Sequence, residues 1–149
     1  MSNILLVPGT APATPATGKA AFFIGPDLTA TVKDDTGAEH PLGKFPRTST
    51  VVTSTAIAPN VNAIDLVEVT ALASALTLQN PTGTSVLGQK LLFKILDNGT
   101  AQTLSFGTAY RALVAALPTT TTSGKLLYLG FIYNTQSSTW DFIARVEQP

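Results

Sequence analysis

Residues 126–146 read LLYLGFIYNTQSSTWDFIARV, and this stretch decides the fold class. Its first part, residues 126–133, is almost entirely apolar, which is typical of a strand covered on both faces. Residues 134–139 are polar and favour a loop. Residues 140–146 then alternate, with Trp140 and every second residue after it on one side. The pattern predicts a long β-hairpin.

A second hairpin is predicted just upstream. Residues 90–96 alternate, with Leu91, Phe93 and Ile95 facing one way. Asn98-Gly99 follows, and this pair is a strong signal for a tight hairpin turn because both residues tolerate positive φ. We expect residues 100–106 to return beside residues 90–96.

Three further strands are predicted in residues 48–57, 64–71 and 75–79, which are rich in β-branched and alternating residues. A helix over residues 66–76 is the competing interpretation, and its Val and Thr content weakens it. Short strands with no convincing long helix predict an all-β protein. Residues 48–149 are expected to form an antiparallel β-sandwich or barrel-like domain.

The N-terminal 18 residues have a different character. Residues 8–18 read PGTAPATPATG, and prolines at this spacing favour an extended, polyproline-like backbone. Residues 1–18 are therefore predicted to be a docking arm, and a disordered tail is the alternative. The candidate docking residues are Ile4, Leu5, Leu6, Val7, Pro8, Pro12 and Pro15.

Residues 19–47 are predicted to form a small β-hairpin unit and a connector. Residues 21–24 and 28–33 resemble strands, Asp34 to Gly37 has turn chemistry, and residues 43–47 resemble a connector. Such a unit is too small to hold a core by itself. We expect it to pack on the rest of the chain or on another copy.

Charge is scarce in this chain. Its 149 residues include nine basic and nine acidic residues, so the net charge is zero, and no basic face for nucleic acid is expected. Charged residues make up 12%, against about 25% in a typical domain. Mean hydropathy is +0.26. We expect much of the surface to be buried in a homo-oligomer; a Thr/Ser/Asn-solvated surface is the alternative.

Targeting and redox signals are missing from the sequence. There is no cysteine, which excludes disulfides and thiolate metal sites. The N-terminus has no basic region ahead of its short apolar run, so a secretory signal is not expected. No apolar stretch is long enough to span a bilayer. Synthesis in the cytoplasm without contact with a membrane is the expectation.

The search for catalytic or metal-binding residues finds no convincing set. His40 is the only histidine, with Asp34, Asp35 and Glu39 nearby in sequence. These carboxylates lack the spacing of an EF-hand loop, and turns favour the same residues. We expect no metal, no cofactor and a surface or interface role for His40.

Enzyme signatures are also weak. There is no G-x-S-x-G elbow and no phosphate-binding glycine loop. Asp65 with Glu68, or Asp141 with Glu147, could be imagined as a glycosidase pair, but outward acids on alternating strands are ordinary surface residues. The chain is predicted not to be an enzyme.

Aromatic residues offer one possible binding chemistry. Tyr110 and Trp140 are candidate glycan contacts, because aromatic rings stack on sugars. Tyr128 and Tyr133 belong to the same set of aromatic residues. The alternative for all four is packing in the core or in an interface.

Two motifs resemble structural proteins of tailed bacteriophages, especially fibre-like ones. PATGKAAFF at residues 15–23, followed by VKDDTG at residues 32–37, resembles a short β unit recurrent in them. NPTG at residues 80–83, GQKL at 88–91 and ILDNGTA at 95–101 resemble a second phage-associated pattern, which continues through FGTAYR at 106–111, LPTT at 117–120 and GFIYN at 130–134 to Trp140.

The resemblance implies a non-enzymatic virion protein made in the host cytoplasm. The expected role is an oligomeric capsid decoration or head-fibre subunit, usually a trimer in such families. Its N-terminal arm would bind the major capsid protein or another virion protein. The alternative is a tail-fibre or baseplate receptor-binding module that contacts host-surface glycan. A glycan depolymerase is the third possibility, and no residue set supports it.

Overall fold

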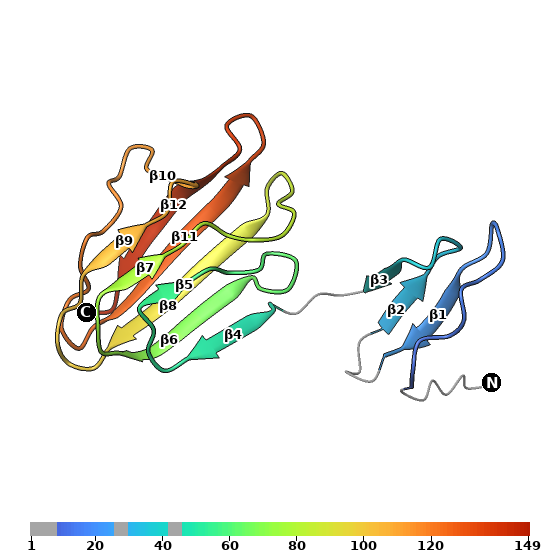
Figure 1. Ribbon diagram of the computed structural model, residues 1–149, viewed down its shortest axis with the longest axis horizontal. Helices are drawn as coiled ribbons and strands as arrows, with labels where there is room; N and C mark the ends of the chain where they lie inside the picture. Colours follow the sequence, from blue (N-terminus) through green and yellow to red (C-terminus); the bar gives the residue numbers. More distant parts are fainter. Residues whose placement is uncertain (1–8, 26–29, 42–45) are drawn as a thin grey trace. The chain divides into compact units, whose positions relative to one another are not determined.

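The computed structural model describes residues 9–25, 30–41 and 46–149 (Figure 1). The chain divides into two compact units, Met1–Phe45 and Pro46–Pro149. The described residues form twelve strands and no helix, which confirms the all-β prediction. Residues 66–72 are a strand, so the competing helix over residues 66–76 is wrong.

The first unit contains one antiparallel sheet of three strands in the order β1-β2-β3. These are β1 (Ala21–Ile24), β2 (Ala30–Lys33) and β3 (Glu39–Pro41). Asp34 closes the turn between β2 and β3. Its Oδ1 accepts hydrogen bonds from the backbone N–H groups of Thr36 and Ala38, each at 2.9 Å. Asp and Asn favour turns for this reason.

The described part of the proline-rich segment, residues 9–18, is bonded to this small sheet. The Gly9 N–H donates to the Ile24 carbonyl at 3.1 Å, and Lys33 Nζ donates to the Pro12 carbonyl at 3.0 Å. The Gly18 N–H donates to the Asp35 carboxylate at 2.6 Å. Pro12 and Pro15 are both partly exposed. The other candidate docking residues, Ile4, Leu5, Leu6, Val7 and Pro8, lie outside the described residues.

The second unit consists of a six-stranded and a three-stranded sheet. Their orders are β10-β12-β11-β8-β6-β4 and β5-β7-β9. In Figure 1 the smaller sheet lies against one face of the larger. The strands are β4 (Thr48–Val51), β5 (Ala56–Ile57), β6 (Leu66–Leu72), β7 (Leu76–Leu78), β8 (Lys90–Asp97), β9 (Leu104–Phe106), β10 (Tyr110–Arg111), β11 (Leu126–Asn134) and β12 (Thr139–Glu147).

Between β4 and β9 the chain alternates between the two sheets, so it winds as a coil. Each strand lies parallel to the strand one coil earlier: β4, β6 and β8 in one sheet, and β5, β7 and β9 in the other. Thr77 and Ser105, one coil apart, share a hydrogen bond of 2.8 Å between their hydroxyls. The prediction of a purely antiparallel domain is therefore wrong, because these pairs and β10–β12 are parallel.

The predicted hairpin at Asn98-Gly99 is also wrong. Gly99 does adopt a positive φ of 91°, but the chain then passes to the other sheet, where β9 pairs with β7. The reason is that β8 has no free edge: it pairs with β6 on one side and with β11 on the other. A returning strand has no place to bind in that sheet.

The long C-terminal hairpin is confirmed, with one change. β11 and β12 pair antiparallel from Asn134 opposite Thr139 to Leu127 opposite Glu147, but a bulge lies beside Gly130 and Phe131. Trp140 and Phe142 are buried, whereas Val146 is 58% exposed. The bulge moves the second half of the alternation to the opposite face, as bulges do.

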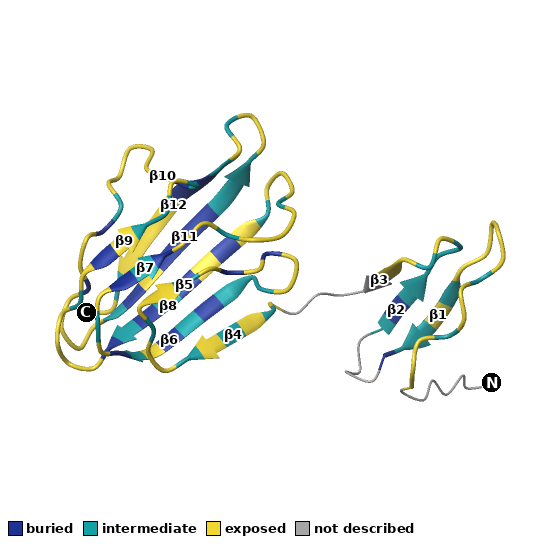
Figure 2. Ribbon diagram, viewed as in Figure 1, coloured by how far each residue is buried: buried dark blue, intermediate teal, exposed yellow. Residues whose placement is uncertain are grey.

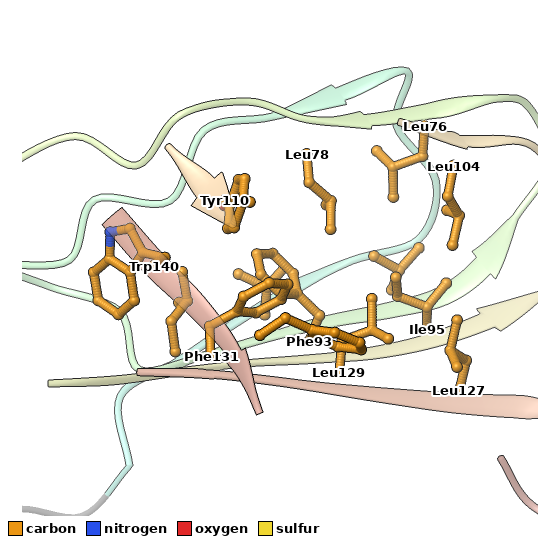
Figure 3. Close-up of a cluster of buried hydrophobic side chains, with 14 of the residues drawn as sticks. Leu76, Leu78, Phe93, Ile95, Leu104, Tyr110, Leu127, Leu129, Phe131 and Trp140 are labelled. Carbon is orange, nitrogen blue, oxygen red and sulfur yellow. The ribbon is translucent and has the colours of Figure 1, made fainter. Parts of the chain in front are cut away.

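One apolar core lies between the two sheets (Figures 2 and 3). Figure 3 shows Leu76, Leu78 and Leu104 of the smaller sheet opposite side chains of the larger. Figure 2 shows the buried positions concentrated on the strands. The fully buried members include Leu72, Leu76, Leu78, Leu91, Phe93, Ile95, Leu127, Leu129, Phe131 and Trp140.

Asp97 fixes the end of β8 and the loops that follow it. The residue is 3% exposed, and its carboxylate accepts hydrogen bonds from the Gly99 N–H at 3.0 Å, the Gly124 N–H at 2.8 Å and Thr121 Oγ1 at 2.8 Å. Burial alone would raise the pKa of Asp97, but the three hydrogen bonds outweigh it and the pKa is lowered.

Replacing Asp97 by Asn should lower the free energy of unfolding at pH 7 by about 1–3 kcal/mol, because a buried charged acceptor is lost. Because the pKa of Asp97 is lower in the folded than in the unfolded state, its ionised carboxylate stabilises the fold at pH values above the unfolded pKa of about 3.9. This stabilisation is lost as the pH falls through the pKa of the folded state. The difference between wild type and variant should therefore shrink below about pH 4. Urea unfolding at pH 7 and at low pH measures it. Thr119→Ala is the control, because Thr119 is exposed and lies in the loop that contains Thr121. A stability difference between wild type and the Asp97 variant that stays constant with pH would contradict a lowered pKa of Asp97.

Candidate functional site

The carboxylates considered for catalysis are each bound to a basic side chain. Asp65 accepts from Arg47 Nε at 2.9 Å and from Arg47 Nη2 at 2.6 Å. Glu68 binds Lys94 Nζ at 2.6 Å. Because Asp65 and Glu68 lie in separate ion pairs, the structure does not bring them together as an acid and base pair.

Asp141 has the most complete set of partners. It is buried and accepts two hydrogen bonds from Arg111, both at 2.8 Å, one from Asn134 Nδ2 at 3.0 Å and one from Thr139 Oγ1 at 3.1 Å. The hydrogen bonds from Arg111 lower its pKa in spite of burial. A glycosidase acid needs a raised pKa. Asp141 is therefore ionised at neutral pH and acts as an anchor for its neighbours.

The pKa values of Glu68 and Glu147 are also lowered by hydrogen bonds from a basic side chain. Hydrogen bonding to Lys94 lowers the pKa of Glu68, and hydrogen bonding to Arg145 lowers that of Glu147. Neither group is held protonated near neutral pH, so neither has the property expected of a general acid.

The acidic residues near His40 serve the turn and its surroundings. Asp34 closes the turn, Asp35 accepts from the Gly18 N–H, and Glu39 lies 3.7 Å from Lys33. The His40 side chain lies outside the described part. Within the residues that the structure describes, no group of three or more His, Cys, Asp or Glu side chains is placed to hold a metal ion.

Tyr110 and Trp140, the candidate glycan contacts, are both in the core. Tyr110 is 6% exposed and packs edge to face with Phe131 at a centroid distance of 4.9 Å. Trp140 is 1% exposed and packs against Tyr133 at 5.3 Å. Figure 3 shows both rings among the buried side chains. Sugar stacking needs an open ring face, and neither of these two buried rings offers one.

A groove lies at one end of the larger sheet. Its volume is about 480 Å³. Backbone hydrogen bonds fix its two walls, from the Gly88 N–H to the Tyr133 carbonyl at 3.0 Å and from the Tyr133 N–H to the Gln89 carbonyl at 2.8 Å. It is lined by Leu87, Gly88, Ile132, Tyr133, Asn134, Thr135, Gln136 and Asp141.

Sequence reasoning missed this groove because it treated residues 134–139 only as a loop. One signal was present: a tyrosine followed directly by Asn134, Thr135 and Gln136. What the sequence did not contain is the position of Leu87 and Gly88, which come from a loop more than forty residues earlier. Their approach depends on the pairing of β8 with β11.

The outer face of the larger sheet, turned away from the core, carries exposed apolar side chains. Leu92 is 45% exposed, Tyr128 42%, Ile143 56% and Val146 58%. Tyr128 lies opposite Val146 in register. Leu92 and Ile143 flank Gly130, since a Cβ added there would lie 3.6 Å from each of them. These four residues are called the apolar outer face below.

The comparisons with known proteins add no relative: no family model matches the chain, and no curated protein is significantly similar to it. Among the described residues there is also no helix with the length and hydrophobicity needed to cross a membrane.

The hydroxyl of Tyr110 is buried and has no hydrogen-bond partner within the described part of the chain. Burial raises its pKa, so it stays protonated. Removing an unsatisfied buried hydroxyl removes a desolvation cost. Tyr110→Phe should therefore raise the free energy of unfolding by about 1 kcal/mol. Chemical denaturation measures this, with Tyr128→Phe on the exposed face as the control. A clear loss of stability would mean that the hydroxyl has a partner.

Proposed function

We propose that this protein is a non-enzymatic structural subunit of a tailed-bacteriophage particle, a capsid decoration or head-fibre subunit that works as a homo-oligomer. The phage assignment rests on the two sequence motifs. Both coincide with structural turns: VKDDTG with the turn closed by Asp34, and ILDNGTA with the turn capped by Asp97. These motifs therefore specify fold rather than chemistry, as expected for a building block.

The observation that carries the assembly role is the apolar outer face. Monomeric proteins seldom expose a contiguous apolar patch of this kind unless it serves binding. The chain has few charged residues with which to cover a free surface. Burial of Leu92, Tyr128, Ile143 and Val146 against another subunit would remove their side chains from water.

A second copy of this chain is the occupant that the charges favour. Glu68 and Lys94 lie beside the patch and neutralise each other at 2.6 Å. Two like faces therefore meet without net repulsion. A partner of strongly acidic or basic surface would gain nothing from this face. A trimer is the expected number, and it rests on the phage resemblance alone.

The two layers of the second unit support the sandwich alternative for the fold. Within the described residues, β4 and β10 end the larger sheet, and β5 and β9 end the smaller. A barrel would need these ends to pair. The open ends count against it.

The receptor-binding alternative loses two of its four candidate rings, since Tyr110 and Trp140 are buried, whereas Tyr128 is exposed and Tyr133 is partly exposed. We therefore keep the virion structural role as the proposal, with the protein located in the particle. The N-terminal arm is proposed to bind the major capsid protein or another virion protein.

The oligomer interface is tested by the double variant Leu92→Lys with Ile143→Lys. Two charges on the apolar outer face should raise the dissociation constant by tenfold or more, about 1.4 kcal/mol. Sedimentation and light scattering measure subunit number, with circular dichroism to check folding. Val114→Lys is the matched control, because Val114 is apolar and fully exposed in a loop. A monomeric wild type, or a double variant that keeps the wild-type mass, would refute the interface.

The arm is tested by two truncations, one that removes residues 1–8 and one that removes residues 1–18. Both should leave the Pro46–Pro149 unit folded and oligomeric but abolish binding to particles that lack the protein. The first keeps the Gly9 contact to Ile24, so it separates docking from the packing of the first unit. Cosedimentation with particles measures binding. Undiminished particle binding by the variant that lacks residues 1–18 would refute the proposal that the arm docks the protein.

A further inference from the structure

Strand β4 ends the larger sheet, and its outer edge is open (Figure 1). Within the described residues β4 pairs only with β6. The Leu66 N–H donates to the Arg47 carbonyl at 3.0 Å, and this bond fixes the phase of the ladder. Because alternate residues of a parallel strand bond the neighbouring strand, Ser49 bonds to β6, whereas Thr48 and Thr50 turn their backbone N–H and C=O groups outward. The edge therefore offers unpaired backbone groups to an incoming strand.

The contact with β6 continues past the end of β4. The Ala71 N–H donates to the Val52 carbonyl at 2.8 Å, and the Ala73 N–H donates to Thr53 Oγ1 at 3.0 Å. The chain thus follows β6 from residue 47 to residue 53. Proteins usually protect such an edge with a charged side chain, a proline or a bulge. Residues 48–53 contain neither charge nor proline, and their register with β6 is regular.

The other strands that end the two sheets are protected. β10 has two residues, and the stretch of β12 beyond it carries Arg145 and Glu147. β5 also has two residues and is followed closely by Pro59. At β9 the Leu104 N–H donates to the Thr119 carbonyl at 2.8 Å. Among the sheet ends of the second unit that the structure describes, β4 is the unprotected one.

The core is also incompletely covered at this edge. Val51 is partly buried and packs against the core cluster, and Val52 beside it is 66% exposed. A strand added to β4 would place side chains beside Val51 and remove more of it from water. Strand addition at this edge therefore combines backbone hydrogen bonds with apolar burial.

The β4 strand of a second copy matches this edge about a two-fold axis. An antiparallel arrangement centred on Ser49 places Thr48 of each copy opposite Thr50 of the other. In an antiparallel ladder each such pair exchanges both of its N–H···O bonds, so all the outward groups are used. Thr–Thr pairs are favourable across strands, and the small Ser49 side chains meet at the centre. The same surface serves both copies, as a two-fold contact requires.

Charge does not oppose this arrangement. Arg47 is the charged residue next to β4, and it is bound to Asp65 at 2.6 Å. Two neutral edges therefore meet without repulsion between like charges. A charged strand would find no free opposite charge along residues 48–53.

We infer that β4 is a self-association edge, at which two copies pair antiparallel through Thr48 and Thr50 and join their larger sheets into one. This contact goes beyond the proposed oligomer interface and does not need it. The apolar outer face lies on β8, β11 and β12, and β6 separates these strands from β4.

Thr50→Pro tests the pairing, made in the full chain that also carries Leu92→Lys and Ile143→Lys, so that association through the apolar outer face is removed. Within the described residues the outward Thr50 N–H has no partner in its own subunit, and an edge strand tolerates proline at such a position. The proline should raise the dissociation constant of the β4 dimer by about tenfold or more, because each copy loses one hydrogen bond to the other. Sedimentation over a concentration series measures this.

Thr50→Ala in the same chain is the matched control. It loses the same hydroxyl, which bonds Glu68 at 3.3 Å, but it keeps the backbone N–H. It should associate as the parent double variant does. Equal association of the Pro and Ala variants, or a double variant that is monomeric at every concentration, would overturn the edge pairing. A double variant that keeps the wild-type mass as a dimer would support the edge pairing and refute the outer-face interface.

Amide hydrogen exchange in the wild-type chain tests the same contact without any substitution. The amides of Thr48 and Thr50 should exchange slowly at high protein concentration and faster on dilution. The Ser49 amide, which faces β6, should stay protected at both concentrations and is the internal control. If Thr48 and Thr50 exchange as open amides at every concentration, a second copy is not the occupant, and a strand of a different protein becomes the alternative.

Discussion

Hydrogen bonding along both edges of β8 is the constraint on which the second unit depends. On one side β8 continues the parallel coil through β6, and on the other it receives the antiparallel hairpin through β11. Its inward residues Leu91, Phe93 and Ile95 are fully buried between the two sheets. The strand thus joins two kinds of pairing and also supplies the centre of the core. The groove exists because this pairing brings Gly88 beside Tyr133.

The few charged residues are used to hold backbone segments in place. Arg47 is bonded to Asp65 and also donates to the carbonyls of Val61 and Asn62, which ties the start of the second unit to the turn before β6. Arg111 likewise ties β10 to the C-terminal hairpin through its two hydrogen bonds to Asp141. The charged groups of these four residues are therefore paired with each other and contribute little to covering the surface.

The sequence predicted the strands better than it predicted their partners. Alternation identified β6, β8 and β12, because side chains in a strand alternate between faces whatever lies beside them, and a continuous apolar run identified β11. Pairing depends on which edges are already occupied, and no local signal carries that information. Asn98-Gly99 is the clearest instance: its turn preference is real, but β11 takes the edge that a hairpin would have used. For the candidate site, the polar loop was visible in the sequence, whereas its opposite wall at Leu87 was not.

The coil also bears on how such a chain varies in length. Each coil of one strand per sheet is bonded to the next by the same parallel pattern, as Thr77 and Ser105 illustrate. Repeated units that contact only their neighbours can be gained or lost without redesign of the remainder. At one end the antiparallel hairpin of β11 and β12 terminates the stack, whereas β4 and β5 end the sheet orders at the other. Duplication of a coil at the β4 end would lengthen the domain along the stacking direction and leave the groove intact.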